Sequence, residues 1–258
     1  METVSSADGS AIAYVCSGRG SSLVLVGGAF SDRTSGEDLA QALAGDFTVF
    51  RYDRRGRGDS DNNDVYSTLQ EAEDLAAIAD EAGGEPFVFG QSSGGALALE
   101  AAAAGLGMRG LVVHEPPYIR GPATSSQTAD RFAQQAAGGK QAEVTEEFLR
   151  NTGTSDEELK RIKDSPVWPR LTLLAPTLPN DIRLLNEGVV PAERLGRIDT
   201  PVLATSGSLS DGWAPAAARA VASAVADGEF RVIDGVGHSV PAEIMAGVLR
   251  DFFIAQRG

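Results

Sequence analysis

Short apolar runs separated by helix-like segments dominate the first 113 residues and restrict the possible fold most strongly. The runs occupy residues 23–26, 47–50, 87–89 and 111–113. They are rich in valine, leucine and phenylalanine and largely lack polar alternation, which is typical of strands buried on both faces of a parallel sheet. Between two of the runs, residues 68–82 carry apolar side chains at helical spacing. This alternation predicts a three-layer α/β architecture, with helices flanking a mostly parallel sheet.

The alternation of strand and helix patterns stops at Pro116 and Pro117. From residue 119 to residue 199 the apolar positions follow helical spacing, with the clearest helices expected over 140–150 and 157–163. The strand pattern resumes after residue 200. We expect strands over 201–205 and 230–233 and a closing helix over 242–253. We therefore expect a core formed by 1–118 and 200–258, with a helical lid, 119–199, inserted between two of its strands.

The charge of this 258-residue chain restricts its partners. Lysine and arginine total 22 against 36 aspartate and glutamate residues, which gives a formal net charge of −14. Such a surface repels phosphate backbones and anionic membranes. We therefore expect a small-molecule substrate, and neither a nucleic acid nor a membrane as partner. The charge leaves the oligomeric state open.

The single cysteine, Cys16, excludes an internal disulfide and offers no metal-binding pattern, so no metal is expected. It lies in a strand-like run, residues 11–16, where we expect a small buried thiol. Residues 1–10 contain no basic region followed by an apolar one, and no apolar stretch approaches the length of a membrane span. These features predict a soluble cytoplasmic protein.

Residues 90–94 read Gly-Gln-Ser-Ser-Gly and stand between a strand pattern and an alanine-rich helix pattern. A G-x-S-x-G sequence at a sharp strand-to-helix turn exposes the serine hydroxyl and brings backbone N–H groups beside it. The flanking glycines let strand and helix approach where a Cβ atom would clash. Ser92 is therefore the candidate nucleophile, and a glycine-rich turn without chemistry is the alternative.

A serine nucleophile needs a general base, and imidazole is the side chain suited to neutral pH. Of the two histidines, His114 ends a core strand pattern, where we expect a hydrogen-bonded structural role. His238 stands in the glycine-flanked segment 235–239, between the last strand pattern and the last helix pattern. Such a loop has room to swing the ring over the edge of the sheet, so His238 is the candidate base.

The base in turn needs an acid that fixes its tautomer and stabilises the imidazolium. Asp211 follows the strand pattern 201–205. Ser92, Asp211 and His238 then occur in the order serine, acid, histidine, each just after a strand. This order and placement resemble the α/β-hydrolase superfamily, and the resemblance covers nearly the whole chain. It implies Ser92 as nucleophile, His238 as base and Asp211 as the orienting acid.

Glu115 is the alternative acid. It follows the preceding strand, another position from which this fold supplies the carboxylate. Many superfamily members place the acid three residues after the glycine that ends its strand, whereas Asp211 comes four after Gly207. The spacing from Asp211 to Pro215 matches the usual D-x-x-x-P continuation, which favours Asp211 with a one-residue insertion upstream.

Residues 23–30 occupy the position of the superfamily's oxyanion loop. The resemblance implies an oxyanion hole formed by the backbone N–H groups of Ala29 and Ser93. Many members carry His-Gly where this chain has Gly27 and Gly28. Residues 52–60 resemble the familiar loop after the next strand. In that loop we expect the arginines to bind neighbouring carboxylates rather than an external anion; they are Arg54, Arg55 and Arg57.

The resemblance implies a cofactor-free serine hydrolase that cleaves a carboxylic ester, lactone or thioester through an acyl-enzyme. A serine at position 92 argues against the dehalogenase and epoxide-hydrolase members, which use an aspartate there. Cleavage of a carbon–carbon bond in a β-diketone-like substrate, a ligand-binding receptor and a cyclase are the alternatives. We expect the substrate pocket between lid and core, with four candidate aromatic residues: Phe30, Tyr118, Trp168 and Trp213.

Overall fold

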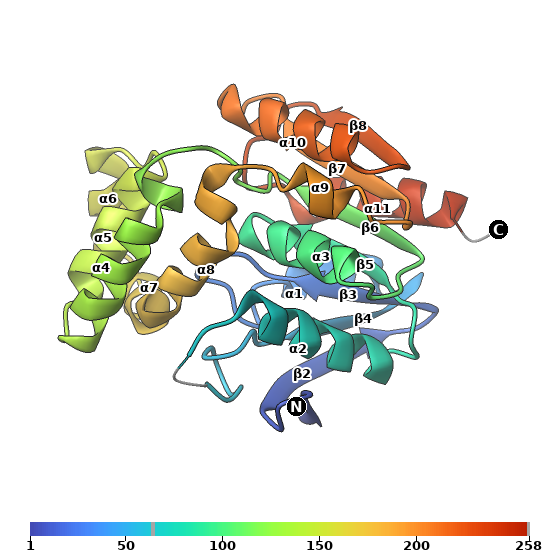
Figure 1. Ribbon diagram of the computed structural model, residues 1–258, viewed down its shortest axis with the longest axis horizontal. Helices are drawn as coiled ribbons and strands as arrows, with labels where there is room; N and C mark the ends of the chain where they lie inside the picture. The colour runs from blue at the N-terminus through green and yellow to red at the C-terminus, as the bar shows by residue number, and fades with distance from the viewer. Residues whose placement is uncertain (63–64, 257–258) are drawn as a thin grey trace. The chain divides into compact units, whose positions relative to one another are not determined.

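The computed structural model describes residues 1–62 and 65–256 and divides the chain into two compact units (Figure 1). The first unit consists of Met1–Pro117 and Val190–Gly258, and the second consists of Tyr118–Val189. The first unit contains an eight-stranded sheet in the order β1-β2-β4-β3-β5-β6-β7-β8. Its strands are β1 (Glu2–Ser5), β2 (Ala11–Gly18), β3 (Ser21–Val26), β4 (Phe47–Tyr52), β5 (Phe87–Gln91), β6 (Gly110–His114), β7 (Val202–Gly207) and β8 (Gly228–Ile233).

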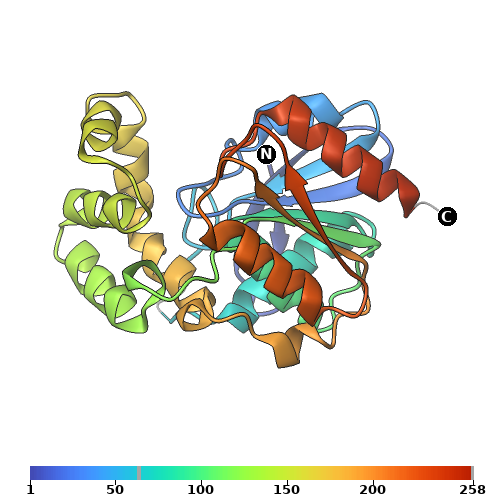
Figure 2. The ribbon, with the colours of Figure 1, turned by 90° about the horizontal axis from the view of Figure 1, so that it is seen from above.

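Helices cover both faces of this sheet. They are α1 (Glu37–Leu43), α2 (Thr68–Glu81), α3 (Ser93–Ala103), α9 (Ala192–Leu195), α10 (Trp213–Ala224) and α11 (Ala242–Ala255). Figure 2 shows α1 and α11 on one face and α3 and α10 on the other. Strand β2 pairs antiparallel with β1 and β4. The six strands from β3 to β8 run parallel to one another. The three-layer α/β fold predicted from the sequence is confirmed.

The apolar runs of the sequence form the centre of the sheet. Strands β6 and β7 are buried along their whole length, as expected for strands covered on both faces. Between the sheet and the α1–α11 layer, the rings of Phe87 and Phe253 stack with their centroids 4.6 Å apart, and Phe47 packs edge-on against both. Because the central strands are parallel, this core holds their carboxyl ends at one edge of the sheet.

The expectation for Cys16 is wrong, because its side chain is exposed. Strand β2 is buried at Ile12, Ala13 and Tyr14, but its last three residues face solvent. The alternating pattern identified the strand correctly, but the edge strand β1 pairs only with Ala11–Tyr14, and the exposed residues of β2 lie beyond that pairing.

The second unit consists of helices and turns in its described residues. Its helices are α4 (Ser126–Ala137), α5 (Gln141–Asn151), α6 (Asp156–Lys163), α7 (Trp168–Leu174) and α8 (Leu178–Leu184), with 3₁₀ turns at Pro122–Thr124, Ala175–Thr177 and Asn186–Gly188. Ser155 caps α6, since its hydroxyl accepts a hydrogen bond from the Glu158 N–H at 3.2 Å. Phe132, Val144 and Leu178 are fully buried within this unit.

The second unit ends at Val189, ten residues before the boundary expected from the sequence. The short helix α9 packs against α3 and α10, so it belongs to the first unit. Whether the second unit acts as a lid stays a prediction. Among the described residues, no helix combines the length and the apolar character needed to cross a membrane.

Candidate active site

Ser92 occupies a strained turn between β5 and α3. Its backbone has φ 55° and ψ −128°, a conformation that L-residues other than glycine rarely adopt. The sharp turn is possible because Gly90 and Gly94 bring strand and helix together. A Cβ atom on Gly90 would lie 2.6 Å from the Gly94 carbonyl oxygen, and one on Gly94 would overlap the Val26 carbonyl oxygen of β3. The sequence motif therefore builds the turn that presents the Ser92 hydroxyl.

Three of the five described non-glycine residues with positive φ come from loops at the carboxyl edge of the sheet. They are Phe30 after β3, Ser92 after β5 and Glu115 after β6. Such conformations cost of order 1–3 kcal/mol each and persist where the surrounding structure enforces them. Their concentration at one edge of the sheet makes this edge the candidate functional site.

A carboxylate and an imidazole meet at this edge. Glu115 Oε2 lies 2.8 Å from His238 Nδ1, and the Glu115 side chain is fully buried. The other carboxylate oxygen, Oε1, accepts hydrogen bonds from the Gly207 N–H at 2.8 Å and from the Ser210 hydroxyl at 2.5 Å. Three donors therefore surround one buried carboxylate.

These donors decide the charge of Glu115. Burial alone would raise its pKa, but the hydrogen bonds from His238, Ser210 and the Gly207 N–H outweigh burial and lower the pKa to about 2. Glu115 is therefore a carboxylate at neutral pH and acts only as an acceptor. It follows that His238 Nδ1 carries a hydrogen, which leaves Nε2 of the neutral ring as a proton acceptor.

Acidification should remove the stabilisation that Glu115 provides. Its pKa in the folded protein, about 2, lies below the ordinary value of 4.5. The stabilisation is therefore fully present above about pH 4.5 and is lost as the pH falls toward 2, with a total of about 3 kcal/mol. Urea unfolding of the wild type and of Glu115→Gln between about pH 6 and 3 measures it. We expect a steeper loss in the wild type, and parallel curves would contradict the assignment.

The carboxylate beside His238 is thus Glu115, whereas the sequence favoured Asp211. In the described part of the chain, no hydrogen bond or ion pair joins Asp211 to the imidazole. Asp211 is exposed, and its carbonyl oxygen caps the start of α10 by accepting from the Ala214 N–H at 2.9 Å. The loop after β7 instead supplies donors, Gly207 N–H and Ser210, to the acid that arrives from β6.

Two contacts hold the His238 loop against the sheet. Gln91 Nε2 donates to the His238 carbonyl oxygen at 3.0 Å, which links the residue before Ser92 to the candidate base. The buried His114 ring lies with Nε2 3.3 Å from the Gly237 carbonyl oxygen and Nδ1 3.0 Å from Thr205 Oγ1. Burial lowers the pKa of His114, so the ring is held neutral in the structural role that the sequence predicts.

Ser92 and His238 come from neighbouring loops but are not hydrogen-bonded to each other in the described structure. The His238 side chain is 46% exposed, and its ring centroid lies 6.4 Å from that of Trp213. Hydrogen bonds between a nucleophile and its base are commonly long before substrate binds and shorten in the reacting complex. The arrangement places the candidate base, His238, at the same edge of the sheet as the strained serine.

The loop after β3 lies directly against Ser92, the candidate nucleophile. A Cβ atom on Gly28 would stand 2.9 Å from both Ser92 Cβ and the Gln91 carbonyl oxygen. Ala29 follows Gly28, and Ser93 is the first residue of α3, where backbone N–H groups point out of the helix end. The two residues expected to form the oxyanion hole thus flank Ser92 from the β3 loop and from the helix.

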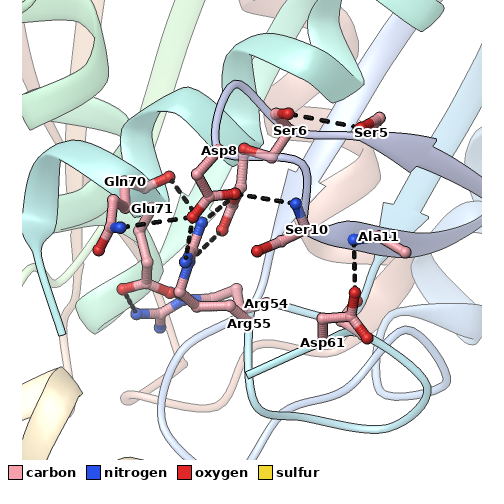
Figure 3. Close-up of polar contacts among 12 residues, drawn as sticks. Ser5, Ser6, Asp8, Ser10, Ala11, Arg54, Arg55, Asp61, Gln70 and Glu71 are labelled. Carbon is pink, nitrogen blue, oxygen red and sulfur yellow. Dashed lines mark hydrogen bonds and ion pairs between the residues drawn. The ribbon is translucent and has the colours of Figure 1, made fainter. Parts of the chain in front are cut away.

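The arginine-rich loop after β4 is buried beneath this site. Arg54 binds Glu71 through Nε at 2.8 Å and Nη2 at 2.7 Å, and Arg55 binds Asp74 in the same two-pronged way. Figure 3 shows Arg54 directed at Glu71 and Arg55 directed at Asp8, which lies 3.0 Å from Arg55 Nη1. Both arginines bind carboxylates, as the sequence predicts.

The four aromatic residues considered for the pocket are divided between the units. Phe30 and Trp213 lie in the first unit, Phe30 in the loop after β3 and Trp213 near His238. Tyr118 and Trp168 lie in the second unit. The first unit also has a cavity of about 320 Å³ next to the nucleophile turn. Its walls include Gly27, Ser31, Gln91, Val240 and Met245. Among the described residues, no group of three or more acidic, histidine or cysteine side chains is arranged to hold a metal ion.

Comparison with known proteins identifies the family. The sequence profile described as Alpha/beta hydrolase family matches residues 20–249. An alpha/beta hydrolase from Sphaerobacter thermophilus is 38% identical, with 98% of this chain and 100% of that chain covered and a TM-score of 0.91. None of the curated proteins compared with the chain matches it significantly.

Two more distant structures share the fold. A thermophilic esterase from Thermogutta terrifontis is 21% identical, covers 100% of this chain and 99% of its own, and has a TM-score of 0.79. The enol-lactonase from Burkholderia xenovorans is 19% identical, with coverages of 98% and 100% and a TM-score of 0.77. The family profile and the relative at 38% identity span almost the whole sequence. This chain therefore belongs to the alpha/beta hydrolase family.

Proposed function

We propose that this hydrolase is a serine esterase that cleaves a carboxylic ester, lactone or thioester through an acyl-enzyme. Ser92 is the nucleophile, His238 the base and Glu115 the acid. The observation that carries the proposal is the 2.8 Å contact between His238 Nδ1 and the buried Glu115, at the sheet edge where Ser92 is held in a strained turn. Asp211 is replaced as the acid because it makes no contact with the imidazole in the described structure.

The charge of Glu115 determines the direction of proton transfer. With Nδ1–H donated to the Glu115 carboxylate, His238 Nε2 accepts the Ser92 hydroxyl proton as Oγ attacks the substrate carbonyl carbon. The positive charge that forms on the ring faces a carboxylate at 2.8 Å. The N–H groups of Ala29 and Ser93 bind the oxyanion of the tetrahedral intermediate.

The intermediate collapses when the bond to the leaving group breaks. His238 Nε2–H then returns its proton to the leaving oxygen or sulfur, and the acyl group stays on Ser92. In the second half, His238 removes a proton from water, and the resulting hydroxide attacks the acyl carbonyl carbon. Collapse of that intermediate breaks the bond between the acyl carbon and Ser92 Oγ, His238 Nε2–H returns its proton to Oγ, and the carboxylic acid is released.

The proposed substrate class rests on the chemistry of the triad and on the names of structures that share the fold. The triad and oxyanion donors act on any acyl group with a leaving oxygen or sulfur. Neighbouring structures described as an esterase and an enol-lactonase support this class. The cavity of about 320 Å³ beside the nucleophile turn is of a size that suits a small acyl or alcohol group.

A fluorophosphonate probe tests the nucleophile. Because the probe phosphonylates only an activated serine, we expect stoichiometric labelling of the wild type and no labelling of Ser92→Ala. Peptide mass spectrometry should place the label on residue 92. Ser239→Ala serves as a matched control, since Ser239 is exposed beside His238 and has no role in the proposal. Equal labelling of the wild type and Ser92→Ala would sink the proposal.

A further inference from the structure

We infer that Arg57 is a positioning residue for the oxyanion hole: its buried guanidinium holds the Gly28 carbonyl and thereby aims the Ala29 N–H at the reacting oxygen. The inference rests on the proposed function and names a residue that the triad chemistry does not use. The sequence predicts that Arg57, like Arg54 and Arg55, binds a neighbouring carboxylate. In the structure Arg57 donates hydrogen bonds to backbone carbonyls of the β3 loop.

The buried Arg57 side chain bridges two carbonyl groups of the β3 loop. Arg57 is 2% exposed, and its Nη1 donates to the Gly28 carbonyl oxygen at 2.5 Å and to the Ser31 carbonyl oxygen at 3.1 Å. The Gly28 oxygen also accepts the Ser31 N–H at 3.2 Å. One guanidinium nitrogen therefore joins the two ends of the turn that contains Ala29 and the left-handed Phe30.

Peptide geometry links the Gly28 carbonyl to the Ala29 N–H. The two groups belong to one planar trans peptide unit, in which C=O and N–H point in opposite directions. Once Arg57 fixes the direction of the carbonyl, the direction of the N–H is fixed as well. A cationic donor on the carbonyl also polarises the unit, which strengthens its N–H as a donor.

Two further contacts place this peptide beside the nucleophile. Gly28 packs against Ser92 so closely that a Cβ atom would stand 2.9 Å from Ser92 Cβ. Arg54 Nη1 lies 3.3 Å from the Gly27 carbonyl oxygen, while Glu71 holds the rest of the Arg54 guanidinium. The loop is thus fixed at successive carbonyls from the buried side and rests on the serine turn with its other side.

Arg55 provides the matched control. It comes from the same loop and is equally buried, at 2% exposure, but it binds Asp74, Asp8 and the Gln70 carbonyl rather than the β3 loop. A purely structural role of Arg57 predicts that replacing either arginine has the same kind of effect. A positioning role predicts that only replacing Arg57 changes turnover by folded protein.

The test compares Arg57→Met, Arg57→Lys and Arg55→Met in the hydrolysis of p-nitrophenyl acetate. We expect Arg57→Met to lower kcat about 10- to 100-fold with KM within about twofold, because the oxyanion charge is absent from the bound substrate and develops only on the way to the tetrahedral intermediate. The Ki of phenylboronic acid, whose serine adduct places an oxygen in the oxyanion hole, should rise in parallel. The pH profile should keep its shape, since the triad is intact. Arg57→Lys, which retains charge and one donor, should recover part of kcat.

Hydrogen exchange of the peptide covering residues 27–31 adds a readout that needs no substrate. Arg57→Met should speed exchange of the Ser31 N–H, whereas Arg55→Met should lower the melting temperature and keep kcat and this protection. If Arg57→Met kept the wild-type kcat, or if Arg55→Met lost as much kcat as Arg57→Met, the inference would be overturned and the proposed function would stand. Full turnover by Ser92→Ala would overturn it together with the proposed function.

Discussion

Replacing Glu115 by Gln should lower kcat about 10³- to 10⁴-fold. Two donors, the Gly207 N–H and the Ser210 hydroxyl, converge on Glu115 Oε1, so the carbonyl oxygen of the new amide will occupy that position. Its NH₂ group will then face His238 Nδ1, where Oε2 now accepts at 2.8 Å. The ring must accept at Nδ1 and carry its hydrogen on Nε2, the wrong tautomer for removing a proton from Ser92.

Steady-state hydrolysis of a p-nitrophenyl ester measures this effect. Asp211→Asn is the matched control and should keep kcat within about twofold of the wild type, because Asp211 is exposed and does not contact the ring. Circular dichroism should show both variants folded. A collapse of activity in Asp211→Asn, with Glu115→Gln fully active, would return the role of the acid to Asp211.

The identity of the acid shows where sequence reasoning ends. Glu115 and Asp211 both follow a central strand, and both give the order serine, acid, histidine. Which carboxylate meets His238 depends on side-chain directions in two loops that a linear pattern does not specify. The positive φ of Glu115 and the donors Gly207 and Ser210 decide the outcome. Ser210 in particular carries no sequence signal that marks it as a partner of the acid.

The nucleophile turn was predictable because its constraints are local. Gly90 and Gly94 are needed where strand and helix nearly touch, so the motif itself encodes the turn in which Ser92 stands. The buried strands were predictable for a similar reason, since a short run of apolar residues is typical of a strand covered on both faces. Arg57 was not, because its partners are carbonyl groups of residues 28 and 31, which no side-chain pattern reveals.

The largest effect on stability should come from Asp74→Ala, which leaves Arg55 with its main partner removed. The two side chains are 1% and 2% exposed and are joined by two hydrogen bonds of 2.7 Å. Burial raises the pKa of Asp74, and the hydrogen bonds from Arg55 act in the opposite direction. Removing one partner of a buried pair typically costs about 3–5 kcal/mol, and we expect that loss in the free energy of unfolding.

A double variant separates the cost of an orphaned charge from the value of the pair. Replacing both partners by apolar side chains, Arg55→Met with Asp74→Leu, should restore much of the loss, since such replacements are often neutral or better. Urea unfolding at neutral pH measures all variants. Glu229→Ala, which removes the surface pair with Arg231, should cost no more than about 1 kcal/mol. If Asp74→Ala cost as little as Glu229→Ala, solvent rather than Asp74 would be satisfying the Arg55 guanidinium.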